Sequence, residues 1–321
     1  MSQSSQNSPL PGKPVQSSFN WLYAFWKFSR PHTIIGTSLS VLGLYLIAIA
    51  ISTDAINPIS TYSLLPVFGA WIACLCGNVY IVGLNQLEDV EIDKINKPHL
   101  PLASGEFSQQ TGQLIVASTG ILALVVAWLT GPFLLGMVAI SLAIGTAYSL
   151  PPIRLKQFPV WAALCIFSVR GTIVNLGLYL HYSWALHQSQ TIPPVVWVLT
   201  LFILVFTFAI AIFKDIPDME GDRLYNITTF TIKLGPQAVF NLSLWVITSC
   251  YLGIILVGVL RVASVNPIFL VVTHLGLLAW LWLRSLTVDL QDKSAIAQFY
   301  QFIWKLFFME YLIFPIACLL A

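Results

Sequence analysis

Long apolar runs separated by short polar segments fill most of the chain. Nine runs are long enough to cross a bilayer, and they lie near residues 33–52, 63–86, 111–130, 132–150, 160–181, 193–213, 238–260, 267–283 and 301–320. A hydrocarbon core about 30 Å thick needs roughly 20 apolar residues per helical crossing. Lipid offers the backbone no hydrogen-bond partners, and the runs lack the alternation of barrel strands. The pattern therefore predicts an all-α, polytopic membrane protein with nine transmembrane helices.

The composition agrees with a membrane location. Of 321 residues, 57% are hydrophobic and only 9% are charged, with a mean hydropathy of +0.82, whereas soluble domains contain about 25% charged residues. The first twenty residues are rich in Ser, Gln and Pro and lack the apolar core of a secretory signal. We expect a disordered cytoplasmic tail at 1–20 and one transmembrane domain at 21–321 in the lipid bilayer, with no nucleic acid and no obligatory protein partner.

The basic residues are unevenly divided between the two sets of loops. With nine crossings, the tail and the loops after even-numbered helices share one side, which collects Lys13, Lys27, Arg30, Lys94, Lys97, Arg154, Lys156, Lys214, Arg223, Lys233, Arg284 and Lys293. The opposite loops carry only Arg261. Because short cytoplasmic loops are enriched in Lys and Arg, the basic side is predicted to be cytoplasmic and the C-terminus to lie opposite. Most acids share this side; Asp54 and Glu310 do not.

Two acidic motifs, NQLEDVEIDK and KDIPDMEGDR, follow the second and sixth apolar runs. Helical spacing places three polar residues of each motif on one face: Asn85, Asp89 and Asp93 in the first, and Asp215, Asp218 and Asp222 in the second. The intervening Glu91 and Glu220 point elsewhere. The motifs recur four helices apart, as in a duplicated unit.

Stacked carboxylates on one helical face repel each other unless a cation lies between them. Aspartate and amide oxygens suit Mg²⁺, which binds one or two carboxylates together with substrate phosphate oxygens. Two facing clusters could hold two Mg²⁺ ions on one diphosphate. The alternative interpretation is that these are solvated acids beside lipid headgroups, and the matched copies on one membrane side argue against it.

Basic side chains and one tyrosine lie near the motifs or in the loop after the fourth run. The candidates for binding phosphate oxygens are Lys94, Lys97, Tyr148, Arg154, Lys156, Lys214 and Arg223. Positive-inside topology alone could explain several of them. Arg170 differs because it lies within the fifth apolar run, where a charge is costly and usually faces a cavity or a buried partner such as an aspartate.

Cysteine and histidine show no metal-binding pattern. All five cysteines fall within predicted helices without paired spacing and are interpreted as small packing residues. The five histidines are scattered along the chain, so no histidine metal site is expected.

The segments NQLEDVEIDKINKP, YSLPPIRLK and KDIPDMEGDR together resemble the UbiA-type intramembrane aromatic prenyltransferases, and the helix count agrees. Five segments are more narrowly similar to homogentisate phytyltransferases of cyanobacterial type, at 28–37, 77–87, 96–106, 211–222 and 299–312. Chlorophyll synthases usually open the first motif with Asn-Asp, whereas this chain has Asn85-Gln86.

The resemblance implies a Mg²⁺-dependent transfer of a phytyl group from phytyl diphosphate to homogentisate, with decarboxylation, on the way to tocopherol. It implies that Asp89, Asp93, Asp218, Asp222 and Lys156 are catalytic. The expected location is the thylakoid or plasma membrane of a photosynthetic organism, with the active site on the cytoplasmic side.

The bases are expected to divide between the two substrates. By resemblance, Arg154 and Lys156 serve the diphosphate. Arg30 is the candidate for the carboxylate of homogentisate, because guanidinium binds carboxylate through two parallel hydrogen bonds.

Other functions stay open. Within the family, they are homogentisate solanesyl- or geranylgeranyltransferase and chlorophyll synthase. A transporter belongs to a different class, and the clustering of acids at one face argues against it, because transport acids would trace a path across the bilayer.

Overall fold

The computed structural model describes residues 18–52, 64–261 and 264–321. Nine segments of this described part are long and apolar enough to cross a membrane: α2 (Pro31–Ile51), α3 (Leu65–Glu88), α5 (Gln109–Thr130), α6 (Pro132–Ser149), α7 to α8 (Pro159–Ala185), α9 (Pro194–Phe213), α12 (Pro236–Leu260), α13 (Pro267–Ser285) and α14 (Lys293–Leu319). The shorter helices are α1 (Ser18–Phe28), α4 (Val90–Asn96), α10 (Asp215–Leu224), α11 (Phe230–Leu234) and the 3-10 turn η2 (Leu155–Gln157). The predicted all-α membrane fold with nine spans is confirmed, and the chain is an integral membrane protein.

Proline marks the starts of most spans. It is the first residue of α2, α6, α7, α9, α12 and α13, and the second of α3. The first turn of a helix tolerates proline because its missing N–H has no intrahelical partner there. Polar side chains cap other starts, as at α5, where the Ser108 side chain accepts a hydrogen bond from the Thr111 N–H. Span boundaries are thus set locally, by residues that the sequence shows directly.

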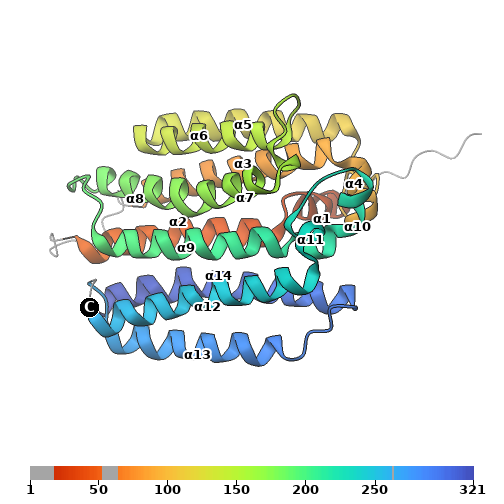
Figure 1. Cartoon of the computed structure of the whole chain (residues 1–321). Helices are drawn as coiled ribbons and strands as arrows, with labels where there is room; N and C mark the ends of the chain where they lie inside the picture. Colours follow the sequence, from red (N-terminus) through yellow and green to blue (C-terminus); the bar gives the residue numbers. More distant parts are fainter. Residues whose placement is uncertain (1–17, 53–63, 262–263) are drawn as a thin grey trace, which may run out of the picture.

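The spans lie side by side as a bundle (Figure 1). In this view α5 and α6 form one edge and α13 forms the other, with α2 and α9 near the middle. The short helices α1, α4, α10 and α11 gather at one end of the bundle, and the C-terminus lies at the opposite end. The two acidic motifs therefore share one end of the molecule, as the even number of helices between them predicts.

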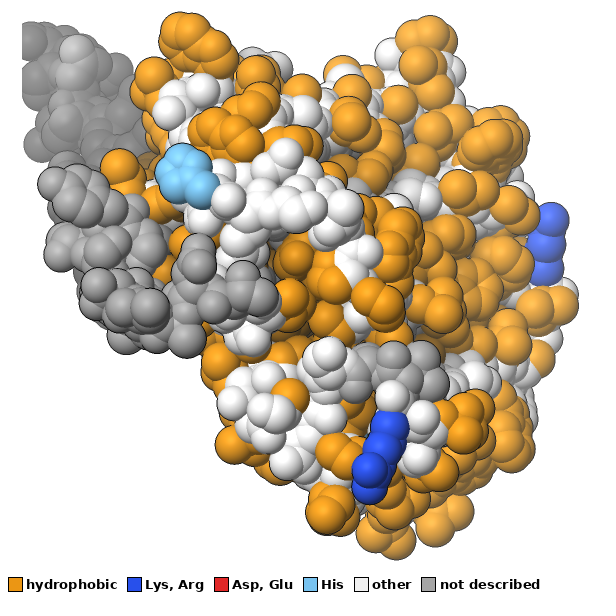
Figure 2. All heavy atoms as spheres, turned by 90° about the vertical axis from the view of Figure 1, so that its left-hand side faces the viewer, with side chains coloured by type: hydrophobic (Ala, Val, Ile, Leu, Met, Phe, Trp, Pro, Cys, Tyr) orange, Lys and Arg blue, Asp and Glu red, His pale blue; other side chains and the backbone are white. Residues whose placement is uncertain are grey.

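The outside of the bundle is apolar. Leu114, Leu129 and Ile268 expose 71%, 73% and 76% of their surface, as expected for residues that face lipid chains. Figure 2 views the end opposite α4 and α10, and it shows hydrophobic side chains over most of the described surface and no Asp or Glu among them. Acidic residues are thus unevenly distributed between the two ends in the described part of the chain.

Two boundaries differ from the sequence-based expectation. The tail is expected to reach residue 20, but α1 begins at Ser18; residues 1–17 lie outside the described part. The last span is expected from residue 301, but α14 begins at Lys293. The Asp292 side chain caps it by accepting a hydrogen bond from Ser294 N–H, so the helix includes a polar first turn that an apolar-run criterion excludes.

The helix that carries the first motif is interrupted. One continuous helix is expected through Asn85, Asp89 and Asp93, but α3 ends at Glu88 and α4 begins at Val90. Asp89 itself lies between them with φ −113° and ψ 17°. Aspartate side chains compete with the helical backbone and favour such ends. The Asp93 N–H still donates to the Asp89 carbonyl at 2.7 Å, so the two carboxylates remain neighbours.

The fifth span contains a π-helical turn, η3 (Ser168–Ile173), between α7 (Pro159–Phe167) and α8 (Val174–Ala185). Such a turn inserts an extra residue and changes the direction of the side chains, often at functional sites. It carries Arg170, the charge within the fifth apolar run, and it packs against α9 through Gly171. A Cβ atom at Gly171 would lie 2.5 Å from the Leu204 Cα.

Gly171→Ala is therefore expected to destabilise the protein by about 1–3 kcal/mol, because backbone must move to admit the methyl group. The midpoint of thermal unfolding in detergent measures this effect. Gly253→Ala is the matched control, since a Cβ at Gly253 meets no heavy atom within 4 Å. Equal midpoints for the two variants would contradict the packing argument.

Candidate active site

A cavity of about 1420 Å³ lies within the bundle and is lined by residues of both acidic motifs. Its polar lining includes Asn85, Asp89, Asp93, Lys97, Lys156, Lys214, Asp215, Asp218 and Asp222. Apolar residues of the spans, among them Ile81, Met137, Val138 and Ile144, line the rest. Typical small-molecule pockets hold about 300–1,000 Å³, so this cavity can accommodate a larger, amphiphilic molecule.

The first motif is joined to the connection between α6 and α7. The Asn85 amide donates to Asp89 Oδ2 at 3.0 Å. Asp89 Oδ1 accepts from Lys156 Nζ at 2.5 Å and lies 3.3 Å from Arg154 Nη2. Asp89 and Lys156 are both buried, so the pair excludes solvent from one wall of the polar region.

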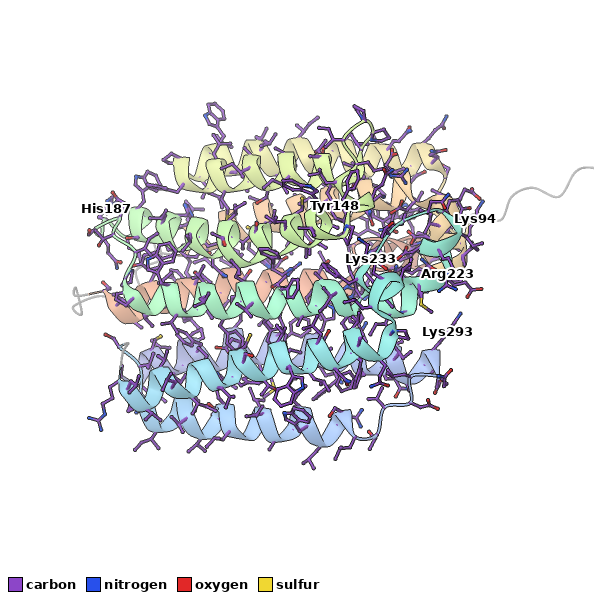
Figure 3. All side chains as sticks on the ribbon, in the orientation of Figure 1. Lys94, Tyr148, His187, Arg223, Lys233 and Lys293 are labelled. Atoms are coloured by element: carbon purple, nitrogen blue, oxygen red, sulfur yellow. The ribbon has the colours of Figure 1, made fainter. Side chains whose placement is uncertain are left out.

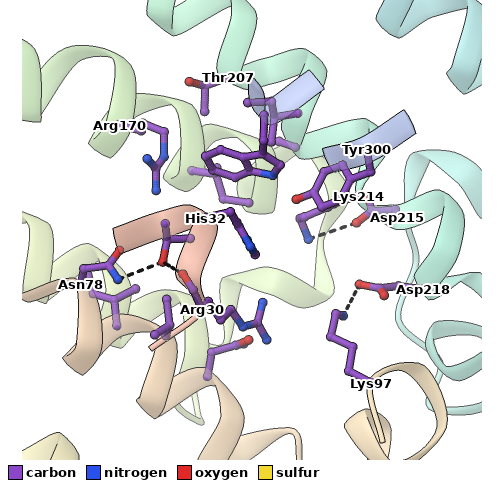
Figure 4. Close-up of a pocket in the computed structure, with 18 of the residues that line it drawn as sticks. Arg30, His32, Asn78, Lys97, Arg170, Thr207, Lys214, Asp215, Asp218 and Tyr300 are labelled. Atoms are coloured by element: carbon purple, nitrogen blue, oxygen red, sulfur yellow. Dashed lines mark hydrogen bonds and ion pairs between the residues drawn. The ribbon is translucent and has the colours of Figure 1, made fainter. Parts of the chain in front are cut away.

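Residues of the second motif approach Lys97, which follows the first motif, at the cavity (Figure 4). Lys97, which ends α4, donates to Asp218 Oδ2 at 2.5 Å. Lys214, at the junction of α9 and α10, lies 3.0 Å from Asp215 Oδ1. The contact between Lys97 and Asp218 brings residues far apart in the sequence to one polar region. A backbone contact supports the same arrangement, because Asn96 Oδ1 accepts from the Gly221 N–H at 2.9 Å.

Burial alters the protonation of these groups. Burial raises the pKa of Asp222 to about 7, with a smaller contribution from repulsion by Asp218. It also raises the pKa of Asp93, although the positive charges of Arg30 and Lys97 act in the opposite direction. Burial lowers the pKa of the Lys156 ammonium, and the adjacent Asp89 opposes that change. Burial is thus the main reason that Asp93 and Asp222 hold their protons to a higher pH than free carboxyls do.

The donor set fits a hard divalent cation. Asp93 Oδ2 is buried without a hydrogen-bond partner, and the raised pKa of Asp222 reports a further carboxyl that lacks compensation. Within the described residues, no group of three or more His, Cys, Asp or Glu side chains could enclose an ion by itself. Mg²⁺ does not require such a cage, since it retains water and phosphate oxygens among its ligands.

Several expected bases do not line the cavity. Lys94 pairs with Glu91 at 2.6 Å, and both side chains are at least half exposed. Arg223 is exposed on α10. Figure 3 shows Lys94 and Arg223 at the outer end of the bundle, whereas Tyr148 lies inside it. Arg154 reaches Asp89 without lining the cavity. A charge in a short loop cannot be assigned to the cavity or to the surface by its position in the sequence alone.

Glu91 and Glu220 point away from the cavity, as helical spacing predicts. Glu91 contacts Lys94, and Glu220 accepts from Lys293 at 2.6 Å on the surface. Their ion pairs have no connection to the aspartates. The two glutamates are therefore natural controls for the acidic motifs.

Among the cavity residues not singled out from the sequence are two aromatic residues and an asparagine. The His32 ring packs against Trp304 in a tilted arrangement with ring centroids 4.8 Å apart, and both residues line the cavity. Asn78 donates to Thr33 Oγ1 at 2.9 Å and also lines the cavity. Asn78 lies seven residues before Asn85, so this helical spacing within an apolar run could have identified it. His32 and Trp304 offer no such signal.

Comparison with known proteins agrees with this architecture. The model of the UbiA prenyltransferase family matches residues 38–306. The homogentisate phytyltransferase of Synechocystis sp. is 57% identical over 296 residues, which cover 92% of this chain and 96% of that protein. Homogentisate phytyltransferase 1 of Arabidopsis thaliana is 43% identical over 306 residues, covering 94% and 77% respectively.

A solved structure shares the fold. A UbiA homologue from Archaeoglobus fulgidus, bound to GPP and Mg²⁺, has a TM-score of 0.61 at 15% identity, covering 93% of this chain and all of that one. The chain therefore belongs to the UbiA prenyltransferase family and is a membrane-embedded prenyltransferase.

Proposed function

We propose that the protein is a homogentisate phytyltransferase. The observation that carries the proposal is the pair of aspartate motifs facing each other at the polar end of a long apolar cavity, in a chain 57% identical to an enzyme of that name. A phytyl chain requires apolar surroundings, and its diphosphate requires cations and hydrogen-bond donors. The cavity offers both environments in one continuous space.

The side chains of the polar region hold the diphosphate. Asn85, Asp89, Asp93, Asp215, Asp218 and Asp222 are the candidates for holding Mg²⁺. When bound, Mg²⁺ would neutralise the diphosphate and so favour its departure from the prenyl chain. Lys97, Lys156 and Lys214 now contact aspartates. With the aspartate charge compensated by metal, their ammonium groups can bind phosphate oxygens instead.

The apolar lining of the cavity surrounds the atoms that react when the prenyl group is transferred. The bond between prenyl C1 and the diphosphate oxygen breaks, and a ring carbon of the acceptor bonds to C1. Diphosphate leaves with the electron pair of the broken C–O bond, and the alkylated ring carbon loses its proton. The bond between the acetate CH₂ carbon and its carboxylate breaks to release CO₂, and the CH₂ carbon takes up a proton to become the methyl group of 2-methyl-6-phytyl-1,4-benzoquinol. Water would capture an allylic cation before the ring could, so the spans contribute by excluding it. Holding the ring beside C1 supplies the benefit of proximity.

Purified protein with Mg²⁺ and homogentisate is expected to turn over phytyl diphosphate with a higher kcat/KM than geranylgeranyl or solanesyl diphosphate. In this assay, Asp89→Ala, Asp93→Ala, Asp218→Ala and Asp222→Ala should each lower kcat/KM by roughly 100-fold or more, because charge at the departing diphosphate is left less compensated.

Glu91→Ala and Glu220→Ala are the controls and should keep near-normal activity, since both carboxylates lie at the surface. A preference for solanesyl diphosphate would assign the protein to another branch of the family. Full activity of folded Asp89→Ala and Asp222→Ala would refute the role of the motifs.

Binding of Mg²⁺ is expected to tighten between pH 6 and pH 8. A carboxyl with a pKa of about 7 holds a proton that the ion must displace at pH 6, and it no longer holds one at pH 8. The stability of the metal-free protein is expected to change with pH in the opposite direction. Asp222 keeps its proton in the folded state up to about pH 7, whereas in the unfolded chain it releases the proton near pH 3.8. The free energy of unfolding therefore falls as the pH rises from about 4 toward 7.

Calorimetric titration with Mg²⁺ at several pH values measures the first effect, and thermal unfolding in a chelator measures the second. Asp222→Asn should flatten both dependences. An affinity that stays constant over this pH range in the unmodified protein would count against Asp222 as a ligand.

The polar end of the cavity is proposed to face the cytoplasm, because the basic loops lie at that end. Single cysteines at Ser104 and Glu220, in a background without native cysteines, should then react with an impermeant maleimide only from the cytoplasmic side. A cysteine at Gln190, near the opposite end, should react only from the other side. Labelling of Ser104 and Glu220 from different sides would exclude a single site formed by both motifs.

A further inference from the structure

Arg170 is a charged residue in a membrane span with no acidic partner. It lies in the π-helical turn of the fifth span and lines the cavity. The ion pairs and hydrogen bonds among the described residues include none from its guanidinium. The aspartate partner considered from the sequence is therefore absent in the described part. An uncompensated guanidinium within a bilayer is costly, which indicates that an anionic ligand completes this position.

The surroundings of Arg170 hold its guanidinium in place without neutralising it. The guanidinium carbon lies 5.2 Å from the ring centre of Trp304 and 5.7 Å from that of Phe307. Gly36 leaves room for it, since a Cβ there would lie 3.3 Å from Arg170 Nη1. Contacts with aromatic faces stabilise a guanidinium cation and leave the N–H groups in its own plane available for hydrogen bonds. A planar, two-oxygen anion matches this geometry.

Arg170 is separated from the aspartates by His32 and Arg30. Figure 4 shows Arg170 and Arg30 on different sides of His32, with Lys97 and Asp218 beyond Arg30. The positive charge of Arg30 also acts on Asp93 of the first motif. Arg30 therefore belongs to the region expected to hold the diphosphate. Arg170 lies in a second, more apolar region with its own positive charge.

We propose that Arg170 binds the carboxylate of the aromatic acceptor and so selects an aromatic acid over its uncharged analogues. This inference rests on the proposed function. The acceptor ring then lies beside the Trp304 and His32 rings, between Arg170 and the polar region. Arg30, the candidate from the sequence, binds the diphosphate instead.

The assignment also explains why a positive charge is tolerated near the reaction. A free guanidinium in an apolar cavity opposes the formation of an allylic cation, because the two positive charges repel each other strongly at low dielectric. A bound carboxylate cancels that charge. Arg170 thus favours the reaction only when an acidic acceptor is present.

Arg170→Gln provides the test, with KM for homogentisate and phytyl diphosphate measured separately. Loss of charge-assisted hydrogen bonds should raise KM for homogentisate by about 10- to 100-fold and leave KM for phytyl diphosphate nearly unchanged. Methylhydroquinone, in which a methyl group replaces the acetate side chain, serves as an uncharged competitor. Its inhibition constant should not change, so the preference for the acid should disappear. The KM of Arg170→Lys for homogentisate should lie between those of the unmodified protein and Arg170→Gln.

Two further variants make the result decisive. Arg30→Gln should raise KM for phytyl diphosphate instead, and Arg261→Gln, an exposed arginine at the other end of the bundle, should change neither constant. If Arg30→Gln removes the preference for the acid and Arg170→Gln does not, the proposal is wrong. If Arg170→Gln keeps the preference for homogentisate over methylhydroquinone, Arg170 has a structural role and the proposal is likewise wrong. Failure of the unmodified protein to convert homogentisate would refute the proposed function itself, which is a separate outcome.

Discussion

Lysine–aspartate pairs at one end of the bundle are the interactions on which the site depends. Lys156 contacts Asp89, Lys97 contacts Asp218, and Lys214 contacts Asp215. The contact of Lys97 with Asp218 joins the segments of the two motifs, and the contact of Lys156 with Asp89 joins the first motif to the connection between α6 and α7. Buried carboxylates without such partners would destabilise the fold by several kcal/mol each. The same pairs keep three ammonium groups beside the carboxylates, where a diphosphate and its metal would need them.

The charged residues of the cavity form two separate groups, one suited to the diphosphate of an amphiphilic substrate and one suited to a small acidic substrate. Aspartates and lysines occupy the end of the bundle, and Arg170 lies apart from them among aromatic rings. Arg170 lies in the π-helical turn and lines the cavity, and the absence of a side chain at Gly171 allows that turn to approach α9 closely. Local irregularity of a span thereby supports the chemistry of the site.

A buried contact between a histidine and a glutamate lies outside the cavity. His274 of α13 and Glu310 of α14 are fully buried, with Nε2 and Oε2 3.0 Å apart. His274 Nδ1 also lies 2.7 Å from the Leu270 carbonyl. Neither residue lines the cavity. The pair joins α13, at the edge of the bundle, to its neighbour, which gives the carboxylate within the last span a structural explanation.

The sequence by itself determined the membrane fold, the number of spans and the common side of the two acidic motifs. These properties follow from apolar run length and charge placement, which are local and one-dimensional. The spacing of the aspartates also identified which carboxylates share a face and which, such as Glu91, do not. Tertiary structure alone decided which bases reach the cavity. Lys97 and Lys94 are three residues apart, yet one contacts Asp218 and the other contacts a surface glutamate. The π-helical turn and the contact of the His32 ring with Trp304 depend on contacts between distant segments, and no periodicity along the chain encodes such contacts.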